Sequence, residues 1–176
     1  TNSGGQGQYD VYALDRANML TGNVARASQF FQSFVNLLMP ADNDGTPPGD
    51  DVPGLLYTIR DGGESYFGNP ASDSIDLYEF DIDWNTPANT SINLAQSFTP
   101  QNSGLANFNW TVCGFFTTEC LPQPGTNQKI DSGSWWPQQR FQYRNFGGHE
   151  ALVGTWTVDV LANGDRAAPR WFELRR

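Results

Sequence analysis

The 176-residue sequence has few charged side chains and very little lysine, histidine and cysteine. Asp, Glu, Lys and Arg together make up 16% of the residues, and the chain has one lysine, one histidine and two cysteines. Helical proteins usually cover their outer faces with Lys and Glu, so this low charge argues against a mainly helical fold. Two cysteines and one distant histidine do not supply the four ligands of a structural zinc site.

Basic patches and long apolar runs are also absent. The net charge is −9 at pH 7, and phosphate backbones bind to basic surfaces, so we expect no nucleic-acid partner. No apolar run approaches the roughly 18 residues of a membrane span, so we expect no membrane insertion. The sequence contains no phosphate-binding loop, nucleophile elbow or dinucleotide fingerprint.

Aromatic residues and turn formers are plentiful. Aromatic residues make up 14% of the chain, which also contains 18 glycines and 11 prolines. This composition predicts a core of large rings and many turns. Residues 16–22 are predicted to form a short helix that Asp15 caps and Gly22 ends. We expect 41–54 to be a loop, and 85–110 to hold at most one short strand. The other periodic segments are strands, which predicts an all-β fold; they are 8–15, 54–62, 75–82, 138–146, 149–160 and 168–176.

Three similar hexamers recur along the chain. "DVYALD", "DLYEFD" and "RWFELR" occupy residues 10–15, 76–81 and 170–175. Their alignment pairs Tyr12, Tyr78 and Phe172 and suggests repeated units of about 40–60 residues, the size of propeller blades. The pattern therefore predicts a partial β-propeller of about two and a half blades of antiparallel strands, with a β-sandwich of the same strands as the alternative. A partial propeller leaves two unpaired sheet edges for a partner to cover, whereas the β-sandwich would be self-contained.

Several longer stretches carry a family resemblance. "CLPQPGTNQKID", "YRNFGGHEALV" and "RWFELRR" resemble uncharacterised exported or cell-surface bacterial proteins with a β-propeller-like region. The resemblance implies that residues 1–176 form one β domain or a fragment of a larger propeller. Its remaining blades would come from the same polypeptide or from another protein chain. The start "TNSGGQGQYD" is typical of the inside of a loop, which leads us to expect a fragment or a processed product.

The two cysteines lie close together in "CGFFTTEC". In a segment rich in Gly and Thr, Cys113 and Cys120 are predicted to form a disulfide, which places the protein outside the cell or at the cell surface. The alternative is a pair of free buried thiols.

The stretch "ADNDGTPPGDD" is the best candidate metal site. Asp42, Asp44 and Gly45 have a D-x-D-G spacing, and alternate carboxylates on a tight loop, with Asp50 nearby, can converge on calcium. The alternative is a solvated acidic loop whose aspartates cap turns.

The stretch "QYRNFGGHEAL" concentrates residues that can act in catalysis. A sialidase-like enzyme would use Tyr143 with Glu150, Asp131 as an acid, and Arg144 to bind an anionic group, with His149 as a further acid or base. The alternative is a hairpin that carries an ion pair and a histidine bonded to the backbone.

Exposed tryptophans are candidates for stacking on sugar rings. Trp135 and Trp136 lie among turn formers in "SGSWWPQQ", so they are the candidate ligand-binding residues. We therefore expect a secreted or cell-surface β module with a structural or binding role in an extracellular assembly, with carbohydrate as a candidate ligand. The alternatives are a sialidase-like glycoside hydrolase and an accessory subunit of a larger complex.

Overall fold

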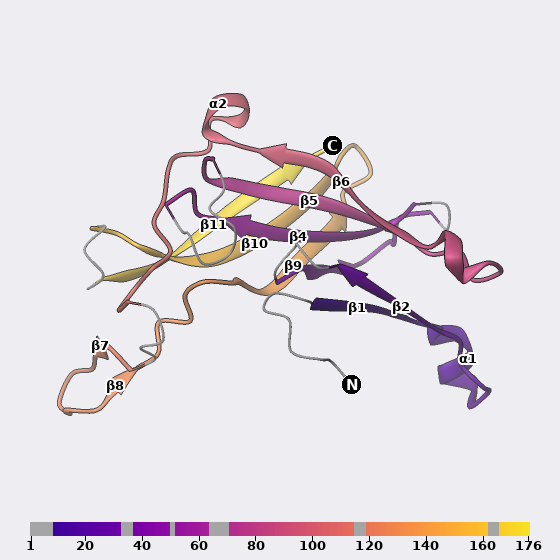
Figure 1. Cartoon of the computed structure of the whole chain (residues 1–176), viewed down its shortest axis with the longest axis horizontal. Coiled ribbons are helices and arrows are strands. Elements are labelled where there is room, and N and C mark those ends of the chain that lie inside the picture. The colour runs from indigo at the N-terminus through magenta and orange to yellow at the C-terminus, as the bar shows by residue number, and fades with distance from the viewer. Residues whose placement is uncertain (1–8, 33–36, 50–51, 64–70, 115–118, 162–165) are drawn as a thin grey trace.

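The computed structural model describes residues 9–32, 37–49, 52–63, 71–114, 119–161 and 166–176. Figure 1 shows short helices at the margins of a strand-rich fold. The helical segments are α1 (Arg16–Thr21), η1 (Pro87–Asn89) and α2 (Pro100–Ser103). The strands are β1 (Tyr9–Leu14), β2 (Ala27–Gln32), β3 (Met39–Asp44), β4 (Gly54–Arg60), β5 (Ser74–Asp81), β6 (Ser91–Phe98), β7 (Leu121–Pro122), β8 (Lys129–Ile130), β9 (Pro137–Asn145), β10 (Glu150–Asp159) and β11 (Ala167–Arg175).

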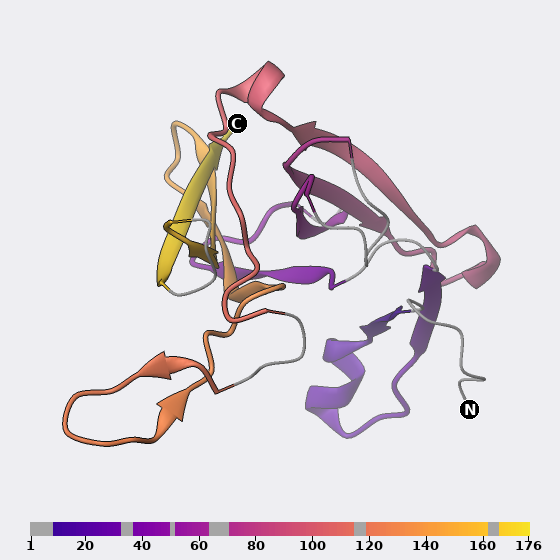
Figure 2. The ribbon, with the colours of Figure 1, turned by 60° about the vertical axis from the view of Figure 1, so that its left-hand side comes forward.

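Seven of the strands form one curled sheet. Their order is β11-β10-β9-β3-β4-β5-β6, and the separate pairs β1-β2 and β7-β8 lie outside it. All pairings within the sheet are antiparallel except that of β3 with β9. Figures 1 and 2 show the sheet curling into a half-barrel, with the β7-β8 pair projecting away from it. The all-β prediction is therefore confirmed.

Most of the predicted elements are also confirmed. α1 begins after Asp15, whose carboxylate accepts the backbone N–H of Asn18, and it ends at Gly22 with a positive φ of 73°. The last three predicted strands are β9, β10 and β11, which pair antiparallel in chain order as a C-terminal meander. The prediction that 41–54 forms only a loop is wrong for its first part. There β3 continues to Asp44, because residues 41–44 pair in parallel with β9.

The three hexamers do not occupy equivalent positions. They lie in the β1-β2 pair, in the interior strand β5 and in the edge strand β11. Tyr12 is 56% exposed, whereas Tyr78 and Phe172 are buried in two different apolar clusters. The expected equivalence is therefore wrong, because a shared pattern of aromatic and acidic residues does not determine where a strand packs. Seven of the described strands form one continuous sheet, and the other four form two separate pairs. Neither separate propeller blades nor a two-sheet sandwich is therefore confirmed.

The concave face of the sheet holds the larger apolar core. Phe98 of β6 and Phe172 of β11 both join this core although they belong to opposite edge strands. Tyr57 of β4 lies at its centre, with its ring centroid 4.4 Å from that of Phe141 and 5.3 Å from that of Phe172. The Tyr57 hydroxyl donates a hydrogen bond to the Thr155 carbonyl at 3.1 Å, so this buried polar group is paired, and burial raises the pKa of Tyr57.

One glycine is required by this packing. A Cβ atom at Gly154 of β10 would lie 2.5 Å from atoms of the Phe172 ring, which is far closer than two carbon atoms can approach. The absence of a side chain at this position lets the ring lie directly on the β10 backbone.

Residues 105–112, which we call the strap, cross the open side of the half-barrel (Figure 2). Their apolar side chains complete the concave core: Trp110 is buried, and the Phe108 ring centroid lies 5.2 Å from that of Trp156. Buried carboxylates of the β4-β5 connection hold the strap in place. Asp73 accepts the Phe108 N–H at 2.5 Å, and Asp61 accepts the Trp110 N–H at 2.9 Å.

The same two aspartates also bind their own connection. The second oxygen of Asp73 accepts the Gly62 N–H at 2.7 Å, and that of Asp61 accepts the Gly63 N–H at 2.8 Å. On the other side of the strap, the Asp159 N–H donates to the Asn109 carbonyl at 2.7 Å. The strap is thus bonded to both halves of the curled sheet.

The convex face carries a smaller apolar core beneath the β1-β2 pair. Ala13 of β1 packs with buried side chains of β4, β5 and β6. Along β4, Leu56 faces this cluster, whereas Tyr57 and Ile59 belong to the concave core. Because both of its faces are covered, β4 is buried along most of its length, as a central strand of a two-sided sheet should be. The buried side chains of this smaller core are Ala13, Leu56, Tyr78, Phe80 and Ile92.

We predict that Asp73→Ala strongly destabilises the fold, because two backbone amides would lose a charged acceptor in a buried place. The expected loss in the free energy of unfolding is roughly 2–4 kcal/mol, measured by urea denaturation. Asp81→Ala, at the exposed end of β5, is the matched control and should change stability by less than about 0.5 kcal/mol. Equal effects of the two substitutions would contradict the role assigned to Asp73.

Candidate functional site

Tyr143 and Glu150, two members of the predicted catalytic set, are in direct contact. The Tyr143 hydroxyl donates a hydrogen bond to Glu150 Oε1 at 2.6 Å. Arg176 binds the other carboxylate oxygen, with its Nε donating to Oε2 at 2.6 Å and its Nη2 also 2.6 Å from that atom. The bonds from Tyr143 and Arg176 hold the pKa of Glu150 below its usual value. The same contact with Glu150 raises the pKa of Tyr143.

This arrangement favours a structural role for Glu150 over an acid-base role. A carboxylic acid that donates a proton near neutral pH needs a raised pKa, whereas the pKa of Glu150 is lowered and both of its oxygens are bonded. The adjacent cavity, bordered by Leu77, Phe98 and Leu174, has a volume of about 220 Å³. That is smaller than the roughly 300–1,000 Å³ of ordinary ligand pockets. The contact ties β9, β10 and the end of β11 together.

The other predicted catalytic residues do not join this pair in the part of the chain that the structure describes. Asp131 is exposed, and its carboxylate accepts the backbone N–H of Gly133 at 2.9 Å. Arg144 lies over the ring of Phe146, 5.3 Å from its centroid, and His149 stacks on the same ring with 5.0 Å between centroids. Arg144 and His149 therefore both contact the exposed ring of Phe146 near the β9-β10 turn.

The predicted metal ligands Asp42 and Asp44 lie in strand β3 and already have protein partners. Asp42 pairs with Arg140 at 3.1 Å, and Asp44 accepts a hydrogen bond from Gln142 at 2.9 Å. Asp50 lies outside the described residues. Among the residues that the structure describes, no three His, Cys, Asp or Glu side chains gather in a way that could hold a metal ion. Calcium binding here stays a prediction.

The two predicted ligand-binding tryptophans have different environments. Trp135 is half-buried and packs against the concave core. Trp136 is 42% exposed, and its ring meets that of Trp135 edge-on with 6.4 Å between centroids. Trp136 also borders a shallow cavity of about 330 Å³ together with Leu37, Met39 and Pro137. Of the two tryptophans, Trp136 is the one placed to meet a ligand.

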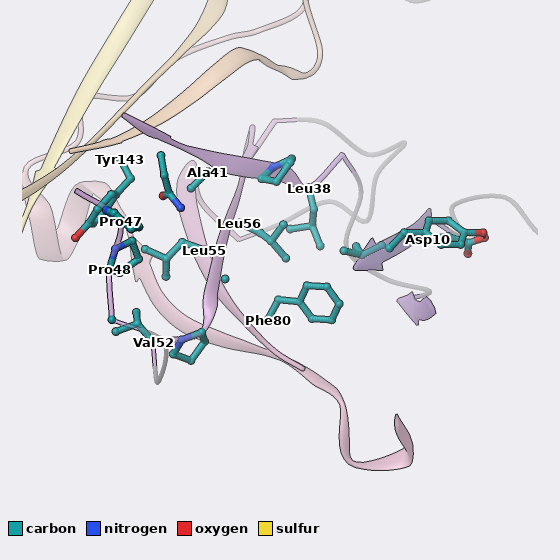
Figure 3. A pocket seen from close by; sticks show the side chains of 17 residues that line it. Asp10, Leu38, Ala41, Pro47, Pro48, Val52, Leu55, Leu56, Phe80 and Tyr143 are labelled. Carbon is teal, nitrogen blue, oxygen red and sulfur yellow. The ribbon is translucent and has the colours of Figure 1, made fainter. Parts of the chain in front are cut away.

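A second cavity, of about 470 Å³, adjoins the first. The two share Asp10, Val11 and Leu38 as lining residues, and we call them together the hairpin groove. In Figure 3, Leu38, Leu56 and Phe80 converge on the larger cavity, with Pro47 and Pro48 at one end and Asp10 at the other.

The groove exists because the sheet separates locally. β3 pairs with β4 only through Met39 and Pro40, after which it turns to β9. The remaining length of β3 and the start of β4 are therefore apart, and the larger cavity lies between them, lined by residues such as Ala41 and Leu55.

Polar groups along the groove are few and lie near its rim. The Tyr12 hydroxyl donates to Asp10 Oδ2 at 3.4 Å, and burial together with the Asp10 charge raises the pKa of Tyr12. Asn43 of β3 also lines the larger cavity and is exposed. The groove thus offers apolar walls, an exposed indole and a few carboxylate, hydroxyl and amide groups.

Of the groove residues, sequence reasoning identified Trp136 as a ligand-binding candidate and Tyr143 only as a catalytic candidate. Val11 and Leu38 carry no signal beyond ordinary hydrophobicity, and their meeting depends on the β1-β2 pair folding back over the sheet. Pro47 and Pro48 were visible as a proline-rich stretch, but that pattern predicts only a turn.

The predicted disulfide between Cys113 and Cys120 is confirmed. None of the described helices is long and apolar enough to cross a membrane. Comparison of the chain with protein-family models, with curated proteins and with solved structures found no match.

We predict that Glu150→Gln destabilises the protein at neutral pH and that this effect shrinks in acid. The pKa of Glu150 is lowered from 4.5 by folding, so the ionised carboxylate contributes its full stability above about pH 4.5. That contribution is lost as the pH falls towards the pKa of the folded state. Denaturant unfolding of wild type and variant across this pH range measures the difference, with exposed Glu119→Gln as the control. A stability difference that does not change with pH would disprove this role.

Proposed function

We propose that this chain is an extracellular β module that binds carbohydrate in the hairpin groove, with Trp136 as the stacking surface. The observation that carries the proposal is the 42% exposure of this large apolar ring on a groove wall. Exposed aromatic rings lose the stabilisation that burial gives them. A ligand with a flat apolar face would recover it.

The chemistry of the groove suits a sugar better than a purely apolar ligand. Sugar rings combine an apolar face, which stacks on an indole, with hydroxyl groups at the edge, which donate and accept hydrogen bonds. The rim carries the Asp10 carboxylate, the Tyr12 hydroxyl and the Asn43 amide, which provide both acceptors and donors. Prolines and leucines supply the remaining contact surface.

An extracellular location is supported by two observations. A disulfide joins Cys113 and Cys120, and disulfides persist mainly in oxidising compartments. The resemblance of the sequence to exported bacterial proteins agrees with this location. Within a longer polypeptide, or as an accessory subunit of a complex, the module would present its groove to a polysaccharide. Calcium at Asp42, Asp44 and Asp50, and further blades beside this sheet, belong to the same proposal.

A sialidase-like hydrolase is the less supported alternative. It would need Glu150 free to react and an acid close to it, whereas Glu150 is bonded to Tyr143 and Arg176.

The test measures binding of the chain to a panel of soluble plant, chitin-derived and bacterial oligosaccharides. Tryptophan fluorescence and calorimetry give the affinity for each oligosaccharide. We expect at least one glycan to bind without releasing reducing ends. Trp136→Ala should lower its affinity at least about tenfold, which equals about 1.4 kcal/mol.

Trp171→Ala is the matched control, because Trp171 of β11 is 68% exposed and lines neither part of the hairpin groove. The Trp171→Ala variant should bind the glycan with the same affinity as wild type. The proposal would be overturned if the chain binds no glycan in the panel, or if only Trp171→Ala lowers the glycan affinity.

A further inference from the structure

The edge strand β6 lies in the longest uncharged part of the chain. No Asp, Glu, Lys, Arg or His occurs from residue 84 to residue 118, although the chain as a whole has a net charge of −9. β6 runs through the first half of this segment, from Ser91 to Phe98. Natural proteins usually protect sheet edges with charged residues, prolines or bulges, because an open edge pairs readily with another strand.

The two edges of the sheet differ in this respect. β11 carries a proline and charged side chains along its length, including Arg170 and Glu173. β6 carries neither a proline nor a charge, although its pairing with β5 has a bulge at Ala95. Its four consecutive residues from Asn93 to Gln96 are all exposed. No strand in the described part of the chain pairs with the outer edge of β6 (Figures 1 and 2).

An apolar side chain also lies exposed on this strand. Leu94 stands opposite Tyr78 of β5 and is 54% exposed. Tyr78 belongs to the convex core beneath the β1-β2 pair, and cross-strand neighbours share a face. Leu94 therefore extends that apolar surface beyond the part that the β1-β2 pair covers.

We propose that β6 pairs antiparallel with β6 of a second copy of this chain, so that the two curled sheets join across a two-fold axis. A two-fold contact places each residue type against the same patch of its partner, so the strand must be compatible with itself. Like charges opposite one another would oppose such pairing. β6 has none, and the amides and hydroxyls of Asn93, Gln96 and Ser91 both donate and accept hydrogen bonds.

Charge also favours this surface over others for self-association. Two copies that each carry a net charge of −9 repel one another where acidic side chains meet. The uncharged segment is where two copies can approach with little repulsion. Main-chain hydrogen bonds would then supply affinity along the edge, with Leu94 as the apolar anchor.

The experiment measures mass by sedimentation equilibrium for wild type and for charged variants at Ala95, an exposed residue of β6. Wild type should reach twice the chain mass of 19.5 kDa. Ala95→Lys and Ala95→Glu alone should each weaken association at least about tenfold, because like charges would be brought close together on the paired β6 strands. An equal mixture of the two variants should form dimers again.

Ala106→Lys is the matched control, because Ala106 is exposed and lies in the same uncharged segment but outside β6; it should dimerise like wild type. Circular dichroism and melting curves establish that every variant folds. The proposal would be overturned if wild type keeps a mass of 19.5 kDa at all concentrations, or if both Ala95 variants associate as strongly as wild type. It would also be overturned if the mixture does not form dimers again, or if the chain forms open-ended assemblies.

Discussion

The structure depends on closing a curled sheet whose edge strands, β6 and β11, pair on one side only among the described strands. Its concave face carries large aromatic rings from β4, β9, β10 and β11, and these would be exposed on the open side. The strap, residues 105–112, covers that side with Phe108 and Trp110. Two buried carboxylates, Asp61 and Asp73, hold it by accepting its backbone N–H groups. Unpaired buried amides are costly, so the same bonds that position the strap also satisfy backbone groups that the core excludes from water.

The convex face is covered less completely, and the candidate binding groove follows from that. Among the β1-β2 residues whose side chains the structure describes, Ala13 is the one buried in the smaller core. Space is left between this pair, the start of β4 and the part of β3 that turns to β9. Trp136, from the segment before β9, reaches the adjoining cavity. The proposed carbohydrate site therefore lies where the fold has not packed its own surface.

Local patterns in the sequence predicted the strands and the short helix well. The caps of α1 at Asp15 and Gly22, the C-terminal meander and the disulfide all rest on contacts between residues close in sequence, and all are confirmed. The parallel pairing of β3 with β9 joins residues about 100 apart, and no local pattern predicts it. The repeated hexamers led to the wrong prediction of equivalent positions. Alternation of apolar and polar residues shows that a strand has an inner face, but it does not show which core that face joins.

The candidate site was predicted only in part for the same reason. Tyr143 and Glu150 are close in sequence across a hairpin, and they do meet. The partner that defines their role, Arg176, directly follows β11, and its reach to Glu150 depends on the register of β10 with β11. Trp136 was identified from its turn-forming neighbours, whereas the groove beside it depends on distant residues such as Val11 and Leu38.

The claim that the strap is a fixed part of the core is tested most directly by amide hydrogen exchange at Phe108 and Trp110. If buried carboxylates hold these two N–H groups, they should exchange as slowly as the amides in the centre of β4, and only when the molecule unfolds as a whole. Exchange of both amides as fast as in an exposed loop, with β4 still protected, would contradict it.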